Sequence, residues 1–222
     1  MSGGCCGEGP DLGRSSAPFK RALWAVIAIN ATMFAVEMTA GQLAGSQALK
    51  ADALDFAADT ATYTISLAVL GASLRVRALA ALGKGASLLV MGVWVLGSTL
   101  WAALGPGLPE APVMGAVGLL ALAANLASVL LLLRFRNGDA NVRSVWLCSR
   151  NDAIGNVAVV LAALGVFGTG TAWPDLLVAG VMSALFLGAS VSILRQAVAE
   201  LRTADAEGEA VEPAHRPEGQ TP

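Results

Sequence analysis

Six long apolar segments follow one another along this chain, separated by short connections that contain polar residues, Gly or Pro. A helix that crosses the hydrocarbon core of a bilayer needs about 20 mostly apolar residues. Segments of about this length or longer occupy residues 23–41, 49–74, 79–104, 113–133, 142–167 and 175–194. The pattern predicts an all-α membrane protein built as a bundle of six transmembrane helices.

The composition agrees with a protein that lies mostly within lipid. Of the 222 residues, 55% are hydrophobic and only 14% are charged, and the mean hydropathy is +0.65. A soluble domain needs many more charged residues to cover its surface. The formal charge of −2 gives no indication of nucleic-acid binding, and three cysteines, two of them adjacent, suggest no disulfide framework. We therefore expect the lipid bilayer, and no nucleic acid, as a partner.

Polar segments flank the predicted helices. Residues 1–16 are polar and rich in Gly, and the first apolar segment is too long for the apolar core of a signal peptide, so we expect it to be retained. The last residues are acidic, contain Pro and Gly and have no apolar periodicity, which is typical of disorder. The expected organisation is a flexible N-terminus at 1–20, a six-helix transmembrane domain at 21–202 and a disordered tail at 203–222.

The cationic side chains predict the orientation of the helices in the membrane. When the six spans alternate in direction, only Lys50 falls on one side of the bilayer, and Lys84 lies just inside a span. Ten cations fall together on the opposite side: Arg14, Lys20, Arg21, Arg75, Arg77, Arg134, Arg136, Arg143, Arg195 and Arg202. The positive-inside rule then places both termini in the cytoplasm. We expect a multi-pass protein of a bacterial inner membrane.

Three carboxylates stand out because they occur in the second apolar segment. Asp55 and Asp59 are four residues apart on one helical face, and Asp52 is close to the same face one turn earlier. An ionisable group at the centre of a membrane helix costs at least ~2.5 to 3.5 kcal/mol, so the cluster implies a cationic partner. A structural ion pair is the alternative. Only Arg150 and Lys84 are available against five membrane acids, which favours a metal ion.

The fifth apolar segment carries the matching polar groups. Cys148 and Asp152 are again four residues apart on one face. The second and fifth spans enter the membrane from opposite sides. At a rise of ~1.5 Å per residue, Asp59 and Asp152 each lie roughly 15 Å deep in the membrane. Asp55, Asp59, Cys148 and Asp152 therefore make a tetrahedral site possible, suited to Zn²⁺ and, through the thiolate, to softer ions such as Cd²⁺. Alternatively, Cys148 is a small buried hydrophobic residue.

At these residues the chain resembles the cation diffusion facilitator family of proton-coupled metal efflux carriers, over about residues 23–201. The most specific part of the resemblance consists of Asn30, Phe34, Glu37, Gly41, Gly45, Ser46 and the Ala-Asp-Ala-Leu sequence at 51–54. The family places His or Asp and then Asp on its second span, where Asp55 and Asp59 stand. On its fifth span it places His and then Asp, where Cys148 and Asp152 stand.

Two departures from the family pattern concern the fifth span, and a third concerns the C-terminus. Cys148 replaces an imidazole with a thiolate, which affects the expected choice of metal. Arg150 lies about 200° around the helix from Cys148 and Asp152, so we expect it to point away from the metal and to pair with Asp52 or Glu37. The cytoplasmic ferredoxin-like domain that usually follows the sixth span of the family is not expected within this sequence.

Three amide side chains within the apolar segments have a simpler expected role. Asn30, Asn125 and Asn156 lie in the first, fourth and fifth apolar segments. We expect them to form hydrogen bonds between helices and not to act as ligands.

The leading functional hypothesis is a secondary transporter that exports a divalent transition-metal cation of the Zn, Cd and Co class from the cytoplasm. Proton antiport is expected because ligands must lose protons to bind a metal. No prosthetic group is expected, since the metal ion is the transported substrate. The resemblance, together with small residues in the third and sixth spans, predicts a homodimer.

Two other functional classes were considered. An intramembrane aspartyl protease also needs two aspartates that share a proton, but neither its Tyr-Asp nor its Gly-x-Gly-Asp motif surrounds Asp59 or Asp152. We therefore do not expect an enzyme. A non-transporting membrane metal-binding or sensor protein of the same fold is the remaining alternative.

Overall fold

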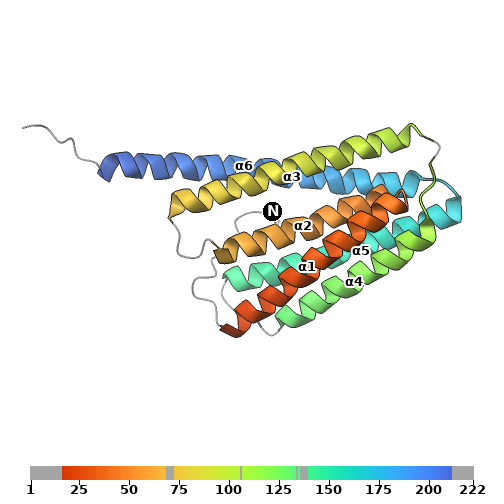
Figure 1. Ribbon diagram of the computed structural model, residues 1–222, viewed down its shortest axis with the longest axis horizontal. Coiled ribbons are helices and arrows are strands. Elements are labelled where there is room, and N and C mark those ends of the chain that lie inside the picture. The colour runs from red at the N-terminus through yellow and green to blue at the C-terminus, as the bar shows by residue number, and fades with distance from the viewer. Residues whose placement is uncertain (1–16, 69–72, 106, 134, 136–139, 212–222) are drawn as a thin grey trace, which may run out of the picture.

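Six helices and short connections make up the described part of the chain (Figure 1). The computed structural model describes residues 17–68, 73–105, 107–133, 135 and 140–211, without the side chains of 66, 140–151 and 205–211. The helices are α1 (Ala17–Leu43), α2 (Gln47–Ala68), α3 (Leu74–Ala103), α4 (Ala111–Leu133), α5 (Ala140–Thr169) and α6 (Trp173–Val211). The predicted all-α fold with six helices is confirmed.

The largest differences between the observed and the predicted helix boundaries occur in three places. α1 begins at Ala17, inside the segment 1–20 that was expected to be flexible. α2 ends at Ala68, so Arg75 belongs to α3 and does not close the second helix. α6 continues to Val211, so the prediction of disorder from 203 is wrong up to that residue, because Ala and Glu there favour a helix. Residues 212–222 lie outside the described part.

α2 is the central helix of the bundle. It contacts each of the other five helices, and it runs through the middle of the view in Figure 1. The other five helices are long and apolar enough to cross a membrane. α2 is less apolar because of Lys50, Asp52, Asp55 and Asp59. A helix with this many charges is tolerated at membrane depth when its polar face looks into the protein.

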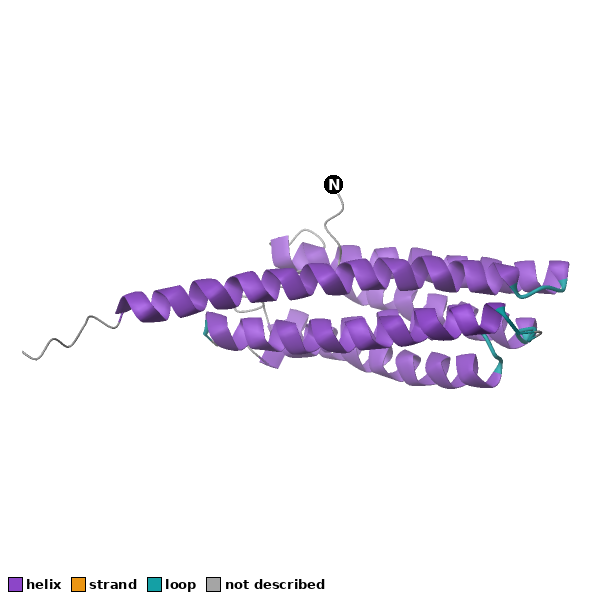
Figure 2. Cartoon of the chain, turned by 90° about the horizontal axis from the view of Figure 1, so that it is seen from above, coloured by secondary structure: helices purple, strands orange, loops and turns teal. Residues whose placement is uncertain are grey.

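The helices form a group of four with a pair beside it. The group of four consists of α1, α2, α4 and α5. Each pair of these helices is in contact except α1 and α5, which make no contact among the described residues. α3 and α6 pack along each other and reach the group of four through α2 and, for α6, also through α5. Figures 1 and 2 show the helices running roughly along one long axis, with the last part of α6 extending beyond the others.

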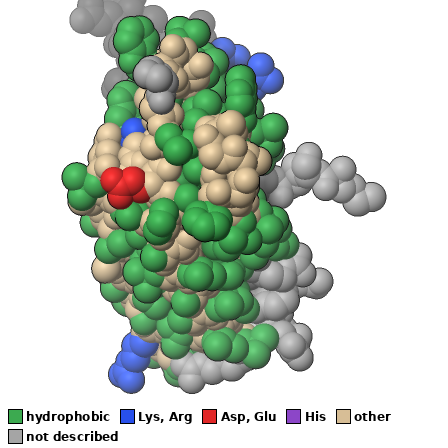
Figure 3. All heavy atoms as spheres, turned by 90° about the vertical axis from the view of Figure 1, so that its right-hand side faces the viewer, with side chains coloured by type: hydrophobic (Ala, Val, Ile, Leu, Met, Phe, Trp, Pro, Cys, Tyr) green, Lys and Arg blue, Asp and Glu red, His purple; other side chains and the backbone are tan. Residues whose placement is uncertain are grey.

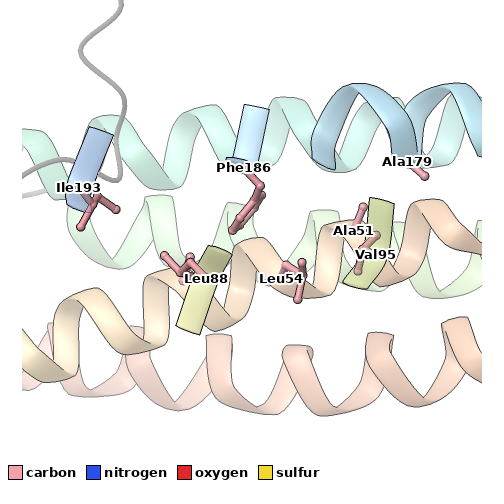
Figure 4. Packing of buried hydrophobic residues seen from close by; sticks show 8 residues of the cluster. Ala51, Leu54, Leu88, Val95, Ala179, Phe186 and Ile193 are labelled. Carbon is pink, nitrogen blue, oxygen red and sulfur yellow. The ribbon is translucent and has the colours of Figure 1, made fainter. Parts of the chain in front are cut away.

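The contact between α2 and the α3–α6 pair is a hydrophobic core. Leu54 of α2 lies among Leu88 of α3 and Phe186 and Ile193 of α6 (Figure 4). The two helices of the pair approach closely at Gly85, where an added Cβ would lie 3.0 Å from Leu194. Part of the small-residue surface that was expected to serve a dimer is therefore used inside the chain.

The outer surface of the bundle suits lipid. Large apolar side chains point outward, among them Val90, Leu130 and Leu185, each more than 60% exposed. The start of α1, with the exposed Arg21, and the start of α3, with the exposed Arg75 and Arg77, lie at the same end of the bundle. Figure 3 looks at the opposite end, where hydrophobic side chains cover most of the face. The expected clustering of cations on one side of the membrane agrees with this arrangement.

Candidate metal centre

The turn between α1 and α2 sets the position of the acidic helix. Gly45 has φ 70°, a left-handed conformation that Gly adopts without the steric penalty of a side chain. The next residue, Ser46, caps α2, because its hydroxyl oxygen accepts a hydrogen bond of 3.1 Å from the backbone N–H of Leu49. This local sequence starts α2 at Gln47 and fixes how deep its carboxylates lie in the bundle.

Asp175 strengthens the same helix start from the other side of the bundle. It lies at the beginning of α6 and is fully buried. Its carboxylate accepts hydrogen bonds from Ser46 Oγ at 2.6 Å and from the backbone N–H groups of Gln47 at 2.9 Å and Ala48 at 3.0 Å. A negative charge at a helix N-terminus is stabilising. Sequence reasoning missed this role, because Asp175 had been assigned only as the start of the sixth span.

Asp59 and Asp152 meet inside the bundle. Asp59 is twelve residues from the start of α2 and Asp152 is twelve from the start of α5, so each lies ~18 Å along its helix. Asp59 is only 8% exposed. Its carboxyl group interacts with the side chains of Asp152 and Tyr63. The expected meeting of these two aspartates from different helices is confirmed.

Two further charged groups act on Asp59. Asp55 lies one turn earlier on α2 and is half-buried, and its charge acts on Asp59. The charge of Lys84, a buried residue of α3, also acts on Asp59 and has the opposite sign. The charges of Asp55 and Lys84 thus act on Asp59, whose carboxyl group also interacts with Asp152. A dication arriving here would meet an excess of negative charge.

Amide side chains hold the acids from neighbouring helices, as the sequence predicted. Asn30 of α1 donates from Nδ2 to Asp59 Oδ2 over 3.4 Å. Asn156 of α5 donates from Nδ2 to Asp52 Oδ2 over 2.6 Å. Asn156 Oδ1 in turn accepts a hydrogen bond of 2.7 Å from Nδ2 of Asn125 on α4. The expected interhelical role of the three asparagines is confirmed.

Only some of the predicted metal ligands have side chains that the structure describes. Within the described residues, no three His, Cys, Asp or Glu side chains are grouped closely enough to hold a metal ion. Cys148 and Arg150 lie on α5, but their side chains are not among those described. The assignment of Asp55, Asp59, Cys148 and Asp152 as ligands therefore stays a prediction, and so does the pairing of Arg150 with Asp52 or Glu37.

Comparison with known proteins identifies the family. Residues 23–202 match the sequence profile of the cation efflux transmembrane domain. The chain belongs to the cation efflux family. This confirms the resemblance seen in the sequence, and the match covers all six helices of the bundle except the two ends of the chain.

Curated relatives of this cation efflux protein come from bacteria. The zinc transporter ZitB of Escherichia coli is 29% identical over 195 residues, which cover 82% of this chain and 62% of ZitB. The metal cation efflux system protein CzcD of Cupriavidus metallidurans is 27% identical over 168 residues, or 70% of this chain and 53% of CzcD. The chain thus spans less than two thirds of the length of these relatives. It is a multi-pass integral membrane protein, and its bacterial relatives agree with the expected location in a bacterial inner membrane.

Proposed function

We propose that this protein is a secondary carrier that exports a divalent transition-metal ion of the Zn, Cd and Co class from the cytoplasm in exchange for protons. The observation that carries the proposal is the contact between Asp59 of α2 and Asp152 of α5, deep in a membrane bundle and beside Asp55. Carboxylates from two helices at this depth need a positive charge. A transported dication supplies that charge.

The chemistry of the proposed ligands favours a metal of this class. Carboxylate oxygens and a thiolate bind Zn²⁺, and the thiolate of Cys148 shifts the preference toward softer ions such as Cd²⁺. The ligands bind metal only when they have lost their protons, so metal and protons compete for the same groups. The names of ZitB, a zinc transporter, and of CzcD, a metal cation efflux system protein, agree with this substrate class.

Lys84 gives the empty carrier a resident positive charge. It is buried in α3, on the helix pair beside the group of four, and its charge acts on Asp59 of α2. When the dication leaves, this ammonium group partly balances the carboxylates that remain. The α3–α6 pair and the group of four helices are the two bodies that we propose to move against each other during transport.

We also propose a homodimer, with the contact on the outer faces of α3 and α6. Gly85 is occupied by packing within the chain, but Gly83 and Gly97 of α3 and Gly180 and Gly188 of α6 have open space where a Cβ would lie. Small residues let helices approach each other closely in lipid. Cross-linking of single-cysteine variants at 97 and 188 in native membranes checks the proposal, and a purely monomeric protein in lipid would contradict it.

Flux into proteoliposomes tests the carrier function. Vesicles that are acidic inside and contain a metal-sensitive dye should take up Zn²⁺ or Cd²⁺ while the proton gradient falls, and a protonophore should abolish the uptake. Asp59→Asn and Asp152→Asn should show no uptake, whereas Glu110→Gln, at an exposed residue before α4, should behave as wild type. Metal binding by the wild type without any uptake would instead support the membrane metal-binding or sensor function.

A further inference from the structure

Two carboxyl side chains outside the candidate metal centre are buried against each other. Glu37 of α1 is 0% exposed and Asp52 of α2 is 1% exposed. The two side chains interact directly. They belong to the two helices that the Gly45 turn connects, and α1 and α2 pack along each other. Two acids from adjacent helices therefore share one buried position.

Most oxygen atoms of this carboxyl pair lack a hydrogen-bond donor. Asp52 Oδ2 accepts the 2.6 Å hydrogen bond from Asn156. Glu37 Oε1, Glu37 Oε2 and Asp52 Oδ1 are buried and accept no hydrogen bond from any residue within the described ranges. A buried acceptor without a donor is costly, and an isolated buried carboxylate costs far more. Among the described residues, the pair therefore lacks at least one positive charge or one donor.

A single proton bound to the pair supplies both the positive charge and the hydrogen-bond donor. When two carboxyl groups share a site, their mutual repulsion and their burial keep one of them protonated. A protonated carboxyl group carries an O–H donor, which can be directed at the neighbouring carboxylate. One of the three oxygens without a donor then accepts a hydrogen bond, and the net charge of the pair falls from −2 to −1.

We propose that Glu37 and Asp52 form a proton-binding site that is separate from the candidate metal centre. One proton is bound between the two carboxyl groups, and release breaks one carboxyl O–H bond, leaving two carboxylates and a proton that passes to water. A dication arriving one turn further along α2 favours that release by its charge. This last step rests on the proposed carrier function, whereas the proton-binding site does not.

The neighbouring elements bring few charges to the pair. On α2, the charge of Asp55 acts on Glu37, and Asp52 itself is hydrogen-bonded to Asn156 and not to a proposed ligand. From α4, the neutral Asn125 belongs to this network through its hydrogen bond to Asn156. Among the described residues, other titratable groups act around Asp59 or at the start of α2: Asp152 of α5, Lys84 of α3, Tyr63 and Lys50 of α2 and Asp175 of α6. The one cation proposed for the pair from sequence, Arg150, is outside the described side chains.

Infrared spectroscopy of the purified, metal-free protein at neutral pH tests the proposal. The carbonyl stretch of a protonated carboxylic acid should be present in the wild type. The double variant Glu37→Gln with Asp52→Asn should remove one component of that band, because it leaves no carboxyl group at the pair. Glu110→Gln, at an exposed acid, should leave the band unchanged, and Asp152→Asn should leave this component in place. Both isosteric amides keep the side-chain size, and thermal unfolding verifies the fold.

A second pair of variants protects the test against misfolding. Glu37→Asp and Asp52→Glu retain both carboxyl groups, so each should shift the component without abolishing it. An unchanged carbonyl region in the double variant would overturn the proposal, and it would mean that both groups are ionised in the wild type beside a cation such as Arg150. Since no metal is present, this outcome does not depend on whether the carrier function holds, and a lack of flux in proteoliposomes would leave it unaffected.

Discussion

Asp175 accepts a hydrogen bond of 2.6 Å from the hydroxyl group of Ser46, across 129 residues of sequence. The same carboxylate accepts hydrogen bonds from the first two backbone N–H groups of α2. The start of α6 is thereby fixed to the start of α2. Since α2 carries Asp55 and Asp59, this junction determines where those carboxylates lie relative to α5.

The first prediction concerns this junction. Asp175→Ala removes the acceptor of three buried donors and should lower the free energy of unfolding by about 2 to 4 kcal/mol. The thermal unfolding midpoint in one detergent measures the effect. Glu110→Ala is the control, because Glu110 is exposed in the connection that leads into α4 at the same end of the bundle. Equal midpoints for the two variants would contradict the capping role.

The second prediction concerns the amide chain from α4 to α2. Asn156→Ala leaves Asn125 Nδ2 and Asp52 Oδ2 without their partners, and each such group costs about 1 to 3 kcal/mol. The double variant Asn125→Ala with Asn156→Ala should be less destabilised than the sum of the single variants, because both belong to one network. Strict additivity in unfolding measurements would show that the three side chains do not act together.

The fold and the meeting of the two aspartates were predictable because they depend on local periodicity. The lengths of the apolar segments predicted the helices. The four-residue spacing of the polar residues, together with the depth of Asp59 and Asp152 in the membrane, predicted that these two side chains meet. The Ser46–Asp175 junction was not predictable, because no local pattern indicates which of several helix ends a buried carboxylate will reach. The extension of α6 was missed because the acidic composition was taken as disorder, although Ala and Glu favour a helix there.

The third prediction concerns the packing of α3 on α6. Gly85→Val should destabilise the protein by about 1 to 3 kcal/mol, because the added atoms meet Leu194 and Ile193 at 3.0 to 3.1 Å. Gly168→Val is the control, at an exposed helical residue of α5 where a Cβ would meet nothing within 4 Å. Unfolding of both variants in the same detergent gives the comparison. Equal loss of stability would mean that helix propensity or lipid contact, and not packing, determines the effect.

The fourth prediction concerns the departure of Cys148 from the family pattern. Cys148→His should retain transport and should shift the preference from Cd²⁺ toward Zn²⁺, because imidazole is a harder donor than thiolate. Cys148→Ser, which is close in size, separates loss of the thiolate from gain of the imidazole. Competition between the two metals in the flux assay measures the shift. An unchanged metal profile in both variants would mean that Cys148 is not a ligand.

The central claim is that one metal ion is bound jointly by α2 and α5, and equilibrium metal binding to the purified protein tests it most directly. Asp59→Asn and Asp152→Asn should each weaken Zn²⁺ or Cd²⁺ binding by more than the roughly 10- to 100-fold lost with an outer-shell partner, and the double variant should be no weaker than the weaker single variant. Wild-type affinity in either single variant, or multiplicative losses in the double variant, would contradict a shared metal centre.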